Sequence, residues 1–128
     1  MAAPITTFNP AGNAYAATAL AAAGVVSVDV DFSTAFVGMA TVKVTMGAAV
    51  ATARGLQIDA LPGYGTGGTT YSTVPLGSPV IGSSTGVSGV ASRMIPLDTG
   101  KYRLTLTNLD ATNAVTVEVT TATVSSVA

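Results

Sequence analysis

From residue 26 onward, apolar and polar side chains alternate along the chain with a period of two. The first such run, residues 26–32, puts three valines and Phe32 on one face and polar side chains on the other. Because successive side chains of a β-strand point to opposite faces, this alternation is typical of a half-buried strand. The pattern recurs over residues 40–46, 56–60, 102–107 and 115–120, so five strands are predicted with a clear register.

Three further stretches, residues 69–74, 79–82 and 87–95, show weaker strand patterns. Glycine and proline interrupt the last of these, which indicates an edge or bulged strand. Asp98-Thr99-Gly100 and residues 108–113 are expected to form turns, so that residues 88–122 would form a three-stranded meander. About eight short strands with frequent Gly, Pro and Asn between them predict an all-β fold, an antiparallel β-sandwich or jelly roll.

The first part of the chain has a different pattern. Residues 1–24 are rich in alanine, and no charged residue occurs before Asp29. Alanine favours helix and Gly24 suits a C-terminal cap, so a short helix is one interpretation, and an extended arm is the other. The expected organisation is therefore an N-terminal arm or short helix over residues 1–24 and a β-sandwich domain over residues 25–128.

Neither a membrane span nor a secretory signal is expected near this end. The apolar stretch over residues 14–28 is mostly alanine and is interrupted by polar residues. It is also shorter than the roughly 20 residues that a spanning helix needs. The first cation is Lys43, so the basic region of a secretory signal is missing as well.

Composition narrows the function classes. The 128 residues are 48% hydrophobic and only 9% charged, against about 25% charged in typical soluble domains. Outward positions must then carry Thr, Ser, Asn and Gly, or be covered by neighbouring subunits. The net charge is −1 and the only local basic cluster is Lys101 with Arg103, which argues against nucleic-acid binding. On a strand these two cations share one face, and a solvated strand face is the simplest interpretation.

Histidine and cysteine are both absent from the sequence. Without them the chain has no disulfide, no thiolate metal site, and neither the commonest general base nor the commonest metal ligand. We therefore expect a protein that is not an enzyme and that holds no cofactor and no metal.

Three sets of residues could contradict this expectation. The run Gly63-Tyr64-Gly65-Thr66-Gly67-Gly68 has the spacing of a dinucleotide fingerprint, but the β-branched residues after it do not favour the required helix, so a surface loop is predicted. The triplet Asp98-Thr99-Gly100 matches aspartic proteases, but Lys101 follows it, and a hairpin turn is preferred.

The third candidate is a calcium site that would combine Asp29 and Asp31 with Asp59 or Asp110. Calcium loops usually bring three or more oxygen ligands within a short stretch of chain, and these carboxylates are spread over several segments. Solvated carboxylates on strands are therefore preferred.

Two tyrosines, Tyr64 and Tyr71, flank the glycine-rich run. Tyrosine combines a large apolar ring with a polar tip and is enriched at protein interfaces, so contact with protein is favoured. A glycan-binding β-sandwich module that uses these rings is the alternative.

Residues 6–13 (TTFNPAGN), 54–59 (RGLQID) and 100–119 (GKYRLTLTNLDATNAVTVEV) resemble small virion proteins of tailed bacteriophages, most of all head decoration or cement proteins. The resemblance implies a capsid decoration protein that stabilises the head, with the virion as its location after assembly in the host cytoplasm. It implies the major capsid protein or other virion proteins as partners, and a homo-oligomer, a trimer or dimer. A tail, neck or fibre component, or a surface-layer or pilus subunit, would share these features.

Under this hypothesis the uncharged N-terminal segment and the loop around Tyr64 and Tyr71 would contact the partner proteins. The candidate partner-contact residues are Phe8, Pro10, Tyr15, Leu20, Tyr64 and Tyr71. No catalytic, cofactor-binding or metal-binding residue is predicted, and neither nucleic acid nor membrane is an expected partner.

Overall fold

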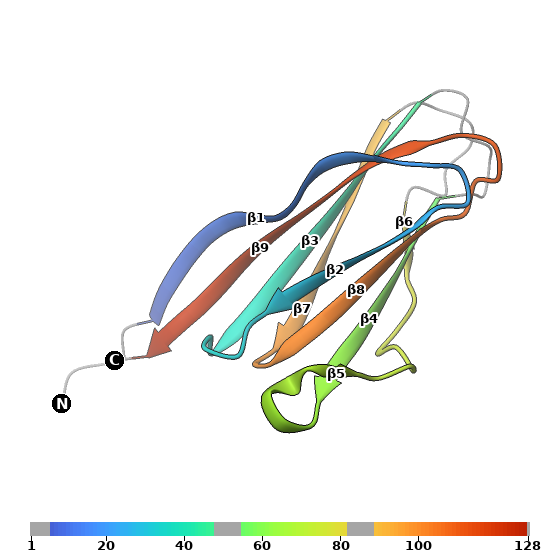
Figure 1. Ribbon diagram of the computed structural model, residues 1–128. Coiled ribbons are helices and arrows are strands. Elements are labelled where there is room, and N and C mark those ends of the chain that lie inside the picture. Colours follow the sequence, from blue (N-terminus) through green and yellow to red (C-terminus); the bar gives the residue numbers. More distant parts are fainter. Residues whose placement is uncertain (1–5, 48–54, 82–88, 128) are drawn as a thin grey trace.

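The computed structural model describes residues 6–47, 55–81 and 89–127, and over these residues the chain forms strands and one short 3₁₀ turn (Figure 1). The 3₁₀ turn is Thr66–Gly68. The strands are β1 (Thr6–Leu20), β2 (Val25–Asp31), β3 (Val37–Met46), β4 (Leu56–Tyr64), β5 (Thr70–Tyr71), β6 (Val80–Ile81), β7 (Gly89–Asp98), β8 (Lys101–Asn108) and β9 (Val115–Val127). All five clearly alternating segments are strands, and the three weaker stretches correspond to β5, β6 and β7. The described residues include no helix long and apolar enough to cross a membrane.

The strands pair into two antiparallel sheets that face each other (Figure 1). The first sheet has the order β1-β9-β3-β7, and the second has the order β2-β8-β4-β5, with β6 also paired to β4. Except around β5 and β6, each connection between successive strands crosses from one sheet to the other. Neighbours in the sequence are therefore seldom neighbours in a sheet.

Strand pairing is nested from the ends of the chain inward. β1 pairs with β9, β2 with β8, β3 with β7, and β4 with β5 and β6. The chain thus forms one long hairpin wrapped over two sheets, which is the jelly-roll arrangement. The predicted fold class, an all-β antiparallel sandwich or jelly roll, is confirmed.

The predicted meander over residues 88–122 is wrong. β7 and β9 belong to the first sheet, while β8 between them belongs to the second. The turn at residues 98–100 exists as expected, with φ of 138° at Gly100, but it joins two sheets. Alternation shows which side chains are buried, but it does not show which strand lies alongside, and this is why the pairing was mispredicted.

The short-helix alternative for the N-terminal segment is wrong for residues 6–20. They form strand β1, which pairs with β9 from Thr6 opposite Val127 to Leu20 opposite Val115. Tertiary pairing overrides the helix propensity of alanine, which is only a weak preference. Pro10 lies within a register shift between Asn9 and Gly12, and an edge strand tolerates the missing N–H of a proline at such a place. β1 belongs to the first sheet, and its contact with a partner stays a prediction.

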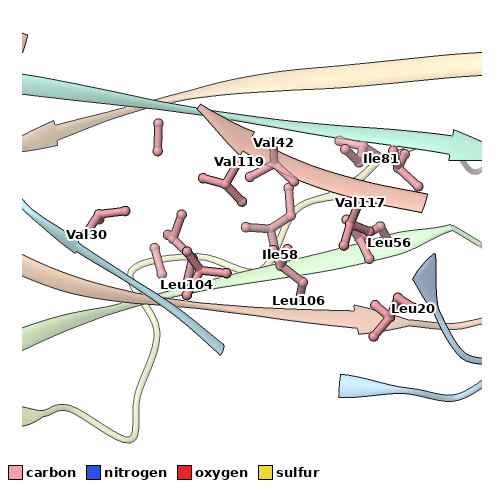
Figure 2. Close-up of a cluster of buried hydrophobic side chains, with 14 of the residues drawn as sticks. Leu20, Val30, Val42, Leu56, Ile58, Ile81, Leu104, Leu106, Val117 and Val119 are labelled. Atoms are coloured by element: carbon pink, nitrogen blue, oxygen red, sulfur yellow. The ribbon is translucent and has the colours of Figure 1, made fainter. Parts of the chain in front are cut away.

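The core lies between the sheets and consists of the inward rows of each strand (Figure 2). Val42 and Val117 of the first sheet and Ile58 and Leu104 of the second are completely buried. Burial of one such side chain is worth about 1.5–3 kcal/mol, whereas an exposed ion pair is worth about 0–1 kcal/mol. Packing between the sheets therefore holds the domain together.

Buried polar side chains close the sandwich at the β8–β9 connection. The Asn108 amide nitrogen donates to the carbonyl oxygens of Ala21 (3.1 Å) and Asn113 (2.9 Å). The Asp110 carboxylate accepts hydrogen bonds from the backbone N–H groups of Thr112 and Asn113, each at 2.8 Å. The turn predicted for residues 108–113 is present, and it also ties down the turn between β1 and β2.

Candidate functional site

The outer face of the second sheet brings charged, amide and hydroxyl side chains from three long strands together. Asp29 of β2 lies opposite Arg103 of β8, and Asp59 of β4 lies opposite Thr105. These positions alternate with the buried rows, so their side chains point away from the core. We call this surface the polar face; its residues are Ser27, Asp29, Asp31, Gln57, Asp59, Tyr71, Lys101, Arg103 and Thr105.

Arg103 is the centre of the polar face. Its Nε donates to Asp29 Oδ1 at 2.8 Å and its second terminal nitrogen donates to Asp29 Oδ2 at 3.1 Å. The guanidinium carbon also lies 4.3 Å from the centre of the Tyr71 ring. A two-pronged carboxylate contact and a stacked ring both use the planar shape of the guanidinium, so its orientation is fixed.

The second cation of the polar face also has an acidic partner. Lys101 Nζ lies 4.0 Å from Asp31 Oδ2. The hydroxyl and backbone N–H of Ser33 donate to Asp31 and hold the pKa of that carboxyl below its ordinary value. Hydrogen bonds from Arg103 likewise lower the pKa of Asp29, against a smaller opposing effect of burial. Both carboxyls are therefore ionised near neutral pH.

On β4, next to Arg103 and Thr105 of β8, the polar face carries one further carboxylate, Asp59. The Gln57 amide nitrogen lies 3.1 and 3.2 Å from the two oxygens of Asp59, and donates to them. Beside this pair, the Ser27 and Thr105 hydroxyls are 3.4 Å apart. Donors and acceptors therefore alternate across neighbouring strands within a small area.

The structure places the two candidate tyrosines on adjacent strands but on different faces. Gly63 of β4 lies opposite Tyr71, and Tyr64 lies opposite Thr70. Tyr71 is half-buried on the polar face, while Tyr64 takes the alternate position and is 58% exposed. The two rings therefore do not form one platform, and only Tyr71 joins the charged residues.

The N-terminal candidates lie in the other sheet. Leu20 is a core residue, and Tyr15 packs partly buried against the core. Phe8 and Pro10 belong to β1, but their side chains lie outside the described part of the chain. The structure therefore does not bring this group together with Tyr64 and Tyr71, and the contact role of all six residues stays a prediction.

The glycine-rich run and the Asp98-Thr99-Gly100 triplet take the loop and turn forms that the sequence favours. The glycine-rich run comprises the last two residues of β4 and most of the loop toward β5, including the 3₁₀ turn Thr66–Gly68. At the Asp98-Thr99-Gly100 turn, the Thr99 hydroxyl donates to the Phe32 carbonyl oxygen at 3.1 Å, which fixes the turn against the β2 end. Among the described residues no group of three or more acidic side chains is placed to hold a metal ion.

The sequence predicted that Asp29, Asp31, Lys101 and Arg103 point outward from their strands. It did not predict that they lie next to one another. Asp29 and Arg103 are 74 positions apart. They meet only because β2 and β8 are neighbours in the second sheet. The available signal was the outward polar row of each alternating strand, and the missing information was the order of strands in the sheet.

No family model matches this chain, and no curated protein matches its sequence significantly. Among solved structures, the chain is similar to a family 35 carbohydrate-binding module from an environmental isolate, with 11% identity and a TM-score of 0.47 over 84% of this chain and 71% of that one. It is also similar to the carbohydrate-binding module CBM36 in complex with calcium and xylotriose, with 21% identity and a TM-score of 0.38 over 91% of each chain.

A third similar structure is the cleaved adhesin domain of Lys-gingipain from Porphyromonas gingivalis, with 11% identity and a TM-score of 0.46. That match covers 77% of this chain, and the chain spans 63% of the adhesin domain's length. None of these three proteins is a phage decoration protein by its description. Similarity this distant does not assign a function to the chain.

Proposed function

We propose that the protein is a non-catalytic binding domain and that its polar face binds an uncharged glycan. The observation that carries this proposal is the fixed arrangement of Arg103 between the Asp29 carboxylate, at 2.8 Å, and the Tyr71 ring, at 4.3 Å. An ordered planar donor over an aromatic ring offers a sugar hydrogen bonds from the guanidinium and an apolar contact with the part of the ring that the guanidinium leaves uncovered. The expected role in a virion, as a capsid decoration protein or another component, stays a prediction.

The chemistry of the polar face matches that of a sugar ring. Each sugar hydroxyl can donate and accept at once, so it needs acceptors and donors at neighbouring positions. Asp29 and Asp59 supply acceptors, while the free guanidinium N–H groups of Arg103 supply donors. The Ser27 and Thr105 hydroxyls supply both. Pairing within the face holds these groups in place before binding, which reduces the entropy lost when a ligand binds.

The charge balance indicates a neutral ligand. Both cations of the polar face already have a carboxylate partner, Arg103 at 2.8 Å and Lys101 at 4.0 Å. The third carboxylate, Asp59, leaves the face with an excess of one negative charge. A sulfate or uronate group would meet no free cation here, so neutral sugars are favoured over acidic ones.

A glycan array that carries neutral and acidic saccharides tests the proposal. The wild type is expected to bind neutral glycans, and Tyr71→Ala and Arg103→Lys are each expected to weaken that binding at least about tenfold. Tyr64→Ala is the matched control, since it removes a tyrosine of the same hairpin from the alternate face. Circular dichroism would confirm that each variant is folded. No signal for the wild type, signal only for acidic glycans, or equal losses for Tyr64→Ala and Tyr71→Ala would contradict the proposal.

A further inference from the structure

The edge of the first sheet formed by β7 has no neighbouring strand among the described residues. β7 ends the order β1-β9-β3-β7 and pairs only with β3, from Val37 opposite Asp98 to Met46 opposite Gly89. Such an edge presents unpaired backbone N–H and C=O groups, to which another extended chain can hydrogen-bond. Val90 and Met94 on this strand are 65% and 59% exposed. The edge is therefore both open and apolar.

The opposite sheet is covered at the corresponding edge. There residues 72–79 follow β4 irregularly, with hydrogen bonds from Leu76 N to Ala60 O and from Ile58 N to Pro79 O, each at 2.9 Å. A groove remains between this segment and β7, and we call it the edge groove. Its floor and walls include Ile58, Leu76, Ile95 and Leu97.

The size of the edge groove suits side chains rather than a whole small ligand. The part beside Ile95 has a volume of about 190 Å³. A second hollow of about 290 Å³ shares Leu76, Pro96 and Leu97 with it. Small-molecule sites usually measure roughly 300–1,000 Å³, so each hollow by itself is smaller than most of them. One or two apolar side chains of an extended peptide would fill the hollow beside Ile95.

A single cation, Arg93, lies at the rim of the edge groove. It is exposed, and it is the one cation of the described residues with no ion pair. By contrast, Lys43, Lys101 and Arg103 each have a carboxylate oxygen within 4.0 Å. Arg93 lies opposite Val42 and therefore belongs to the row of β7 that faces the groove. A partner that lies in the groove would bring its own acid to this position.

We propose that the edge groove binds an extended peptide segment of a partner protein, which adds to β7 as a further strand. The segment carries an acidic side chain against Arg93 and an apolar side chain, two residues away, in the hollow beside Ile95. The spacing follows from the strand period, because Arg93 and Ile95 are alternate residues and strand neighbours opposite them share their face. The inference rests on β7 and Arg93 alone and does not depend on the glycan proposal.

Selection from a surface-displayed library of random heptapeptides tests this inference with the folded full chain as bait. Peptides selected by the wild type are expected to be enriched in Asp or Glu two positions from Leu, Ile or Val. Arg93→Gln should abolish the acidic enrichment. The matched control, Lys43→Gln, removes a cation from the adjacent strand β3 and should leave the enrichment unchanged.

The best selected peptide, made synthetically, then separates strand addition from simple charge attraction. Its affinity for Arg93→Gln is expected to fall at least about tenfold, and N-methylation of alternate amides should cause a comparable loss, because it removes the backbone hydrogen bonds to β7. No enrichment with the wild type, identical enrichment with Arg93→Gln, or full binding of the N-methylated peptide would overturn the proposal. Glycan binding should be unaffected by Arg93→Gln in every case.

Discussion

The polar face and the edge groove belong to one sandwich but differ in whether their cations have carboxylate partners within the chain. On the polar face, Lys101 and Arg103 each have a carboxylate partner within the chain. In the edge groove, Arg93 has no such partner among the described residues and is surrounded by apolar side chains. Internally paired groups offer a ligand a fixed pattern of hydrogen bonds, while an unpaired cation selects a partner by charge. The two proposed ligands differ accordingly: a neutral sugar for the polar face and an acidic peptide for the edge groove.

The largest expected effect comes from a substitution in the core. Both surfaces depend on the same core, so unfolding would abolish binding at both. Val117→Asp places a carboxylate at a completely buried position between the sheets, where nothing compensates its charge. We expect a loss of more than about 4 kcal/mol in the free energy of unfolding, which is a large part of the roughly 5–15 kcal/mol that stabilises a typical domain. Thermal melting followed by circular dichroism measures this loss.

The control for that variant is the next residue along β9. Glu118→Ala removes only a partly exposed ion pair with Lys43, at 3.8 Å, and should change the stability by at most about 1 kcal/mol. Equal melting temperatures for the two variants would show that the assigned register of β9 is wrong.

An intermediate effect is expected from a substitution that disturbs the polar face but leaves the edge groove unchanged. A Cβ atom added at Gly63 would lie 2.4 Å from the Gly68 carbonyl oxygen and 2.9 Å from that of Lys101. Both atoms are backbone, so Gly63→Ala must displace the loop between β4 and β5, and with it the Tyr71 ring. We expect a loss of about 1–3 kcal/mol in stability and weaker glycan binding, with peptide binding unchanged.

Gly47→Ala is the matched control for the loop variant, since an added Cβ there meets nothing within 4 Å. Calorimetric titration with the best array glycan and with the selected peptide compares the two surfaces directly. If Gly63→Ala weakened both ligands equally, the two surfaces would not be independent.

The smallest expected effect is a pH dependence confined to the polar face. Hydrogen bonds from Arg103 lower the pKa of Asp29 from its ordinary value of 3.8. A group whose pKa is lower in the folded state contributes stability above its unfolded pKa, and that contribution disappears as the pH falls through 3.8 toward the folded value. Melting temperatures measured from neutral to acidic pH should show a small decrease in this range.

Asp29→Asn provides the comparison for the pH series. It should remove part of the acidic decrease and lower the glycan affinity at neutral pH, because Arg103 loses its charged partner. A pH profile identical to that of the wild type would mean that the Asp29–Arg103 pair does not couple to folding.

The sequence predicted the strands well because alternation records burial directly. Val28, Val30 and Phe32 are buried and Val26 packs against the core, as the period of residues 26–32 indicates. The pairing was harder, since nothing local distinguishes a β7 that joins β8 from a β7 that joins β3. The helix alternative for the alanine-rich segment was wrong for a related reason, because the partner that makes β1 a strand is β9, at the other end of the fold.

The candidate sites were less predictable than the fold. Asp29 and Arg103 appeared in the sequence as separate outward charges, and only the order of strands in the second sheet joins them. The sequence also contains an indication of the edge groove that alternation alone does not explain. Arg93 interrupts the inward row that contains Ala91 and Ile95, and a cation in an otherwise apolar row marks a place where the core opens to solvent.

The pairing of β1 with β9 has a consequence for biosynthesis. β1 leaves the ribosome before β2 to β8 and cannot pair with its neighbour until β9 has been made. The β-sandwich is therefore expected to close only after β9 has been made, and to close slowly, because its pairs join segments far apart in the sequence. Until then the uncharged segment before Asp29 is exposed in the growing chain, which makes it a natural binding site for a chaperone.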